Sequence, residues 1–204
     1  MGIENWKKEL IEHKYALLLS LLFLIIAIVL DYNAGNYVSN VGGAVVPDLL
    51  LDHLPVIDLD GIFVYGLIII MAVLFFYPLF FKMNELHKVI SQFSLLLMVR
   101  SLFICLTHLT PPGDALSFQF PQIFSWLQFK NDLFFSGHTA VPFLGFLLFK
   151  KEKIRFFFLA SAIIMALVVL FMHVHYTIDV LSAFFITYGT FKIGEWFFTK
   201  INKY

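Results

Sequence analysis

The chain of 204 residues has few charged residues and almost no cysteine, and both shortages restrict what it can be. Only 14% of the residues are charged, whereas 60% are hydrophobic and 26 are phenylalanine. This composition excludes an ordinary soluble domain, and we expect no nucleic-acid partner. The single cysteine, Cys105, excludes an internal disulfide. We therefore expect a protein that lies in a lipid bilayer.

Long apolar stretches predict the fold. Each is close to the roughly 20 residues that a helix needs to cross the hydrocarbon of a bilayer. They cover residues 15–30, 61–81, 89–109, 132–149, 154–173 and 176–198. No low-complexity linker and no internal repeat separates them. We predict an all-α, polytopic membrane protein, a six-transmembrane-helix bundle that forms a single domain over residues 1–204.

Basic residues are missing from alternate connections, and this predicts the orientation. The connection from Asp31 to Gly61 has no Lys or Arg, and the connection between the third and fourth stretches has only Lys130. Basic residues gather before the first stretch and in the other turns. By the positive-inside rule, we expect both termini to be cytoplasmic. Whether the chain forms a homo-oligomer is left open.

Ionisable residues within the apolar stretches are rare, and each costs about 2.5 to 3.5 kcal/mol to insert. With the exception of Arg100, which lies deeper, those near the expected site fall at the outer ends of their stretches. They are Arg100, His108, His138, His173, His175 and Asp179. We expect Lys192 and Glu195, at the inner end, to snorkel or to pair with each other. A functional site on the non-cytoplasmic side is therefore predicted.

The densest cluster is HVHYTIDV, residues 173–180. If the chain is helical from His175, then His175 and Asp179 lie one turn apart on the same face. A carboxylate on one imidazole nitrogen would leave the other nitrogen nucleophilic. A buried pair that only ties two helices together remains the alternative.

The segment SGHT, residues 136–139, predicts a phosphate site. Ser136 and Gly137 would expose backbone N–H groups at the start of a helix, where phosphate binds readily. His138 would stand beside that phosphate as a general acid, and the fork of donors on Arg100 would bind its oxygens. The alternatives are a packing contact of small residues and a buried arginine paired with an aspartate.

These residues resemble the sphingomyelin synthase family, a branch of the type 2 phosphatidic acid phosphatase superfamily. FFSGHT and HYTIDV are similar to the third and fourth motifs of that family. VVPDLLLDHLP is similar to the first motif, and RSLFICLTHLTPPGD is similar to the second. The four stretches occur in the expected order over about residues 47–184. This resemblance implies a multi-pass membrane enzyme.

The resemblance implies a catalytic triad of His138, His175 and Asp179. In this interpretation His175 attacks a lipid phosphodiester, Asp179 orients it, and His138 protonates the departing diacylglycerol. A phospholipid donor and a lipid alcohol acceptor, such as ceramide, are the expected partners, and no metal or other cofactor is expected. Further residues are expected to contact the substrate: Arg100, Ser136, Gly137, Asp48, Asp52, Asp132 and Tyr176.

The sequence also departs from these families. The third motif usually begins Cys-Gly-Asp, whereas Lys130, Asn131 and Asp132 stand here. The Lys-x6-Arg-Pro motif of the wider superfamily is missing, and so is the arginine expected near Val169. Fewer cations favour a singly charged phosphodiester over a monoester dianion. Three functions remain open: a lipid phosphotransferase that moves phosphocholine or phosphoethanolamine, a lipid phosphatase or phospholipase C-like hydrolase, and a catalytically silent membrane protein.

Overall fold

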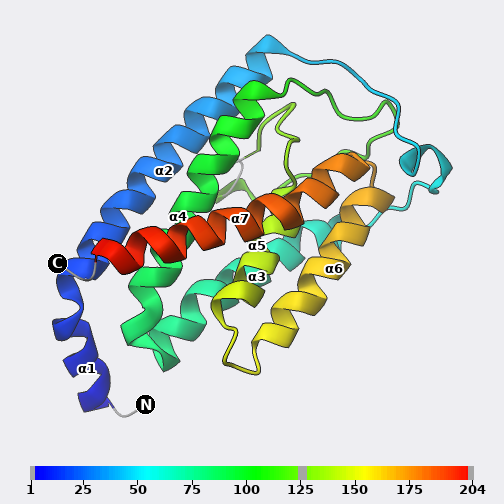
Figure 1. Ribbon diagram of the computed structural model, residues 1–204. Helices are drawn as coiled ribbons and strands as arrows, with labels where there is room; N and C mark the ends of the chain where they lie inside the picture. Colours follow the sequence, from blue (N-terminus) through cyan, green and yellow to red (C-terminus); the bar gives the residue numbers. More distant parts are fainter. Residues whose placement is uncertain (1–2, 124–127, 202–204) are drawn as a thin grey trace.

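The structure is a computed structural model that describes residues 3–123 and 128–201, and in this part of the chain it is helical (Figure 1). One isolated bridge, between Ala44 and Leu109, joins two connections. The helices are α1 (Ile3–Glu12), α2 (Lys14–Val41), the 3-10 helix η1 (Leu51–His53), α3 (Asp60–Phe81), α4 (Met83–Leu106), α5 (Gly137–Leu148), α6 (Arg155–Phe171) and α7 (Thr177–Ile201). The prediction of an all-α fold is therefore confirmed for the described residues.

Three of these helices, α2, α3 and α4, are long and apolar enough to cross a membrane. Two further apolar helices are shorter, since α5 has 12 residues and α6 has 17. A helix of 12 residues is about 18 Å long, well short of a hydrocarbon core of about 30 Å. The structure thus agrees with a membrane protein, while the six-span count and the cytoplasmic termini stay predictions.

The stretch 132–149 is only partly helical, which corrects the expected fourth helix. Helix α5 begins at Gly137, and the preceding residues are irregular. A distant side chain stabilises this irregular backbone, because Arg100 on α4 binds the carbonyls of Asp132 and Phe135. These bonds give the carbonyls partners that no regular structure supplies there. The irregular segment fixes where α5 begins.

Helix α1 has no counterpart among the predicted elements. It is amphipathic and packs beside the start of α4 (Figure 1). Trp6 donates its indole N–H to the carbonyl of Leu79 at 2.7 Å, and the carboxylate of Glu9 accepts the N–H of Asn84 at 3.2 Å. With 10 residues, α1 is about half as long as a membrane-spanning helix, so the length of apolar stretches does not predict it.

Helix α5 lies inside the bundle, against α6 and α7 (Figure 1). Most of its residues are buried, from His138 to Gly145. Gly145 allows the close approach, because a Cβ there would collide with the ring of Phe158. Helix α5 also packs into the main core, which contains Phe135, Leu144 and Phe158. This packing holds the first turn of α5, and hence His138, at a fixed place.

Candidate active site

The first turn of α5 meets the first turn of α7. Ser136 is the N-cap residue of α5, and its backbone N–H donates to the carbonyl of Asp179 at 3.1 Å. No side chain among the described residues caps α5 at Ser136. The N–H groups that follow are those that a helix leaves without an internal partner. Two of the predicted motifs, residues 136–139 and residues 175–179, therefore lie together.

His138 is buried in this first turn. Its ring stacks on Phe63 of α3, with the ring centroids 3.8 Å apart and the planes at 20°. Its Nε2 atom has no hydrogen-bond partner among the residues that the structure describes. Gly137, the residue before His138, lies beside Nε of Arg100.

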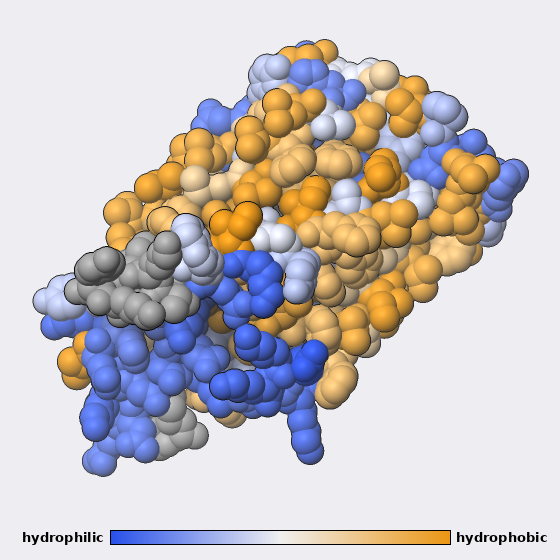
Figure 2. Space-filling view, viewed as in Figure 1, coloured by the Kyte–Doolittle hydropathy of each residue, from blue (hydrophilic) through white to orange (hydrophobic). Residues whose placement is uncertain are grey.

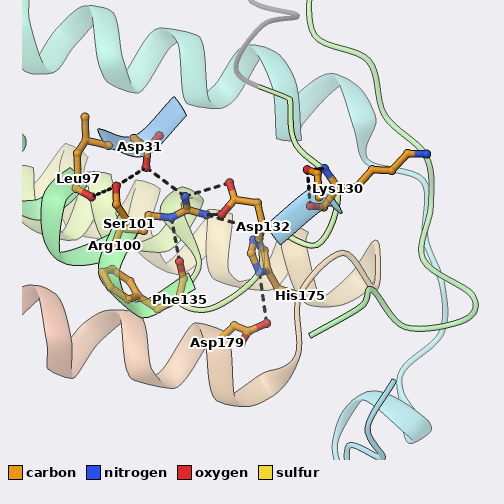
Figure 3. A network of polar contacts seen from close by, with 10 residues as sticks. Asp31, Leu97, Arg100, Ser101, Lys130, Asp132, Phe135, His175 and Asp179 are labelled. Carbon is orange, nitrogen blue, oxygen red and sulfur yellow. Dashed lines mark hydrogen bonds and ion pairs between the residues drawn. The ribbon is translucent and has the colours of Figure 1, made fainter. Parts of the chain in front are cut away.

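His175 precedes helix α7, so the condition that the chain is helical from His175 is not met. The helix begins at Thr177, and Asp179 lies in its first turn. The pairing nevertheless forms, because Oδ2 of Asp179 lies 3.4 Å from Nδ1 of His175 and accepts the N–H of Tyr176 at 2.9 Å (Figure 3). A carboxylate in the first turn satisfies the free N–H groups there. Asp179 is completely buried, and its Oδ1 has no partner in the described part of the chain.

Arg100 is paired rather than free (Figure 3). Its Nη1 donates to Oδ2 of Asp132 at 3.0 Å, and its Nη2 lies 2.7 Å from Oδ1 of the same carboxylate. Its Nε donates to the carbonyl of Phe135 at 3.2 Å, and Asp31 of α2 lies 3.8 Å from Nη1. The pairing with an aspartate is therefore present, and the phosphate contact expected of Arg100 stays a prediction. Arg100 and Asp132 together fix the segment before α5.

Gly137 faces this arginine. A Cβ at Gly137 would lie 3.4 Å from Nε of Arg100, an ordinary van der Waals distance. The start of α5 therefore lies directly against the guanidinium, with space left for a Cβ. The phosphate role expected of Gly137 stays a prediction.

Asp48 joins the connection after α2 to the start of α7. Its Oδ2 accepts the N–H of Thr177 at 2.6 Å, and its Oδ1 accepts the hydroxyl of Thr177 at 2.8 Å. Burial alone would raise the pKa of Asp48, but the hydrogen bonds from Leu51, Thr177 and Leu50 lower it below its ordinary value. Asp48 thus caps the start of α7 at Thr177, and Thr177 is two residues before Asp179.

Tyr176 is buried and tied to the same connections. Its hydroxyl donates to the carbonyl of Thr110 at 2.8 Å and accepts the N–H of Val46 at 3.2 Å. Asp52, in contrast, is exposed on η1. The roles expected of Asp48, Asp52 and Tyr176 in binding substrate stay predictions.

His173 is separate from the triad. Its φ is +54°, an uncommon conformation for a residue other than glycine, and its Nδ1 lies 2.9 Å from Oδ2 of Asp114. That hydrogen bond lowers the pKa of the exposed Asp114. His173 thereby anchors the connection after α4 to the turn before α7.

Two side chains at this site were missed by sequence reasoning. Phe63 is one of 26 phenylalanines, and nothing in its surroundings in the sequence marks it. Asp31 ends an apolar stretch and was assigned to a connection, but α2 continues through it to Val41. An acidic residue inside a long apolar helix signals a buried partner, and Arg100 is that partner.

Buried polar atoms without partners gather where α5 and α7 meet. Among the residues described, they include Ser136 Oγ, His138 Nε2, Thr139 Oγ1 and Asp179 Oδ1. A buried polar atom without a hydrogen bond costs about 1 to 3 kcal/mol. Several such atoms at one place are typical of a binding site, where a ligand supplies the hydrogen bonds that the protein does not.

The fold and this site define a class, a helical membrane protein with two histidines and an aspartate beside an open helix N-terminus. Residues 131–196 match the PAP2_C family model, described as PAP2 superfamily C-terminal, over about a third of the chain. No curated protein and no solved structure matches the chain. The match includes His138, His175 and Asp179, supports membership of the PAP2 superfamily, and so supports a phosphoesterase or phosphotransferase.

Proposed function

We propose that the protein is a lipid phosphotransferase that moves a phospho-alcohol head group from a glycerophospholipid to a lipid alcohol such as ceramide. One observation carries the proposal. The uncapped start of α5, with His138, lies against the start of α7, where Asp179 holds His175. Phosphate binds well at such a helix terminus, and a phosphate bound there lies next to both histidines.

In the first half-reaction, Nε2 of His175 attacks phosphorus and the bond to the glycerol oxygen breaks. The carboxylate of Asp179 near Nδ1 keeps that nitrogen protonated and leaves Nε2 as the nucleophile. His138 gives its proton to the departing oxygen, so diacylglycerol leaves as a neutral alcohol. The head group remains on His175 through a phosphorus–nitrogen bond.

In the second half-reaction, the hydroxyl oxygen of the acceptor attacks phosphorus and the phosphorus–nitrogen bond breaks. His138 now takes the proton from that hydroxyl, and His175 returns to its starting state. The same two histidines therefore serve both halves, and the protons balance over the cycle.

The charge near the site favours a phosphodiester substrate. Asp132 and Asp31 lie within 4 Å of the guanidinium of Arg100, so its positive charge is already compensated. A phosphate monoester would bring two negative charges into this environment, and a diester brings one. A glycerophospholipid diester is accordingly the preferred donor, and phosphatidate is a poor one.

A hydrolase on the same scaffold differs only in the acceptor, because water would replace the lipid alcohol. The apolar surroundings of His138 favour the lipid alcohol. Its ring is stacked on Phe63 and lies 6.4 Å from the ring of Phe120, so the groups beside this acid are aromatic. Aromatic walls accommodate a lipid more readily than they hold water.

The test is a lipid analysis by mass spectrometry. The purified protein is incubated in mixed micelles with phosphatidylcholine, phosphatidylethanolamine, phosphatidate and ceramide. We expect diacylglycerol together with a ceramide phospho-alcohol, and the product identifies the head group. His175→Ala and His138→Gln each lower turnover by at least about 100-fold, since each removes one proton-transfer or nucleophilic step.

The matched control is His53→Gln, which changes an exposed histidine on η1. It leaves turnover at the wild-type rate. Diacylglycerol with a free phospho-alcohol, and no ceramide product, would replace the transferase with the hydrolase. Full turnover by folded His138→Gln would remove the acid from the mechanism.

A further inference from the structure

A cavity lies at the other end of the bundle, where α4 begins, α5 ends and α7 approaches its C-terminus. Its volume is about 500 Å³. It is lined by charged side chains at the rim and by apolar side chains within: Lys82, Glu85, Lys88, Val89, Gln92, Leu148, Phe149, Lys150, Lys151, Glu152, Phe191, Glu195 and Phe198. Gln92 precedes Arg100 by eight residues, about 12 Å along α4, so this cavity is separate from the candidate active site.

The rim of this cavity carries more positive than negative charge. Four lysines and three glutamates line it. Two of the lysines are already paired, since Lys82 lies 2.6 Å from Glu152 and Lys150 lies 3.0 Å from Glu195. Lys88 and Lys151 have no ion pair with any residue in the described part of the chain, and both are exposed. Two ammonium groups are therefore free for an anion.

Gln92 belongs to the packed wall of the cavity. It is only 4% exposed, and its Nε2 donates to the carbonyl of Phe191 at 3.2 Å. Its Oε1 is buried against Gly194 of α7, where a Cβ would collide with it, so this oxygen does not face the cavity.

The remaining walls are apolar. Phe149 and Phe191 are buried at 1% and 5% exposure, and Leu148 and Phe198 lie beside them. Around this end of the molecule, hydrophilic residues adjoin an apolar surface (Figure 2). A ligand for this cavity thus needs an anion and an apolar part.

We infer that this cavity binds an anionic phospholipid, taken from the leaflet at this end of the bundle. The phosphate lies between Lys88 and Lys151, and the first part of an acyl chain contacts Leu148 and Phe198. A single negative charge matches the excess of one positive charge on the rim. The site is a binding site only, and it is independent of the proposed chemistry.

The experiment uses the purified full chain in neutral detergent and native mass spectrometry. The added probes are phosphatidylglycerol, phosphatidylcholine and inorganic phosphate. We expect one phosphatidylglycerol per chain to be retained, and neither of the other probes. The variant with both Lys88→Gln and Lys151→Gln retains phosphatidylglycerol about ten-fold more weakly, because it loses two charge-assisted contacts.

Lys153→Gln is the matched control, because this exposed lysine lies in the same turn but does not line the cavity. It binds phosphatidylglycerol as the wild type does. A loss in Lys153→Gln equal to that in the double variant would overturn the inference, since charge at the surface would then suffice. Equal retention of phosphatidylcholine would overturn it too, and retention of inorganic phosphate would assign the site to a soluble anion.

Discussion

The hydrogen bonds of Asp48 lead to a prediction that separates a structural role from substrate binding. Its two carboxylate oxygens accept bonds from Thr177, and Oδ1 also accepts the N–H groups of Leu50 and Leu51. In Asp48→Asn one of the two oxygens becomes an NH₂ group, which would face a donor. Hydrogen bonds to a charged group contribute about 1.5 to 3 kcal/mol, and partial exposure of Asp48 reduces this to about 1 to 2 kcal/mol.

This loss is measurable as a shift in thermal unfolding. For a chain of this size, about 1 kcal/mol corresponds to about 2 to 4 °C, so Asp48→Asn unfolds about 2 to 8 °C below the wild type. Intrinsic fluorescence of the purified protein in detergent reports the transition. Asp52→Asn removes the same charge from an exposed position on η1 and leaves the transition unchanged.

The pH dependence gives a second readout of the same cap. The folded protein holds the pKa of Asp48 below its ordinary value of 3.8. Its stabilisation is therefore fully present above that ordinary value and is lost as the pH falls through the lower, folded pKa. The difference between wild type and Asp48→Asn shrinks in that range. An unchanged unfolding temperature with a raised KM would refute the cap and favour the substrate contact that the resemblance implied.

The remaining predictions concern the groups that position His138. Arg100→Lys loses the fork that holds Asp132 and the carbonyl of Phe135, so kcat falls by about ten-fold or more. His138→Gln has a smaller relative effect in the Arg100→Lys background than in the wild type. Steady-state lipid assays of the wild type, the two single variants and the double variant measure both effects. Additive losses would contradict a positioning role for Arg100. Phe63→Leu keeps an apolar side chain but removes the stacked ring, so kcat falls several-fold with little change in KM, and an unchanged kcat would contradict the role of the stack.

Sequence reasoning located the helices better than it located their ends. The α-helices α2 to α7 each overlap one of the predicted apolar stretches, whereas the 3-10 helix η1 overlaps none of them. Sequence reasoning could not predict that residues 132–136 would be irregular, since their carbonyls bind Arg100 from 32 or more residues away. The cap on α7 is also long-range, with Asp48 and Thr177 separated by 129 residues. Contacts of this kind depend on how helices pack, and no local pattern carries them.

The same comparison bears on how a site with so few cations would hold the proposed phosphate. The sequence suggested that Arg100 would bind the phosphate, but two aspartates compensate its charge. What remains at the site is the N-terminus of α5, which no side chain caps among the described residues, whereas Asp48 caps α7. A helix N-terminus acts as about half a positive charge and presents N–H groups to an oxyanion. This partial positive charge balances a phosphodiester, which has one negative charge, better than a monoester dianion. Arg100 contributes indirectly, because it fixes the backbone that carries those N–H groups.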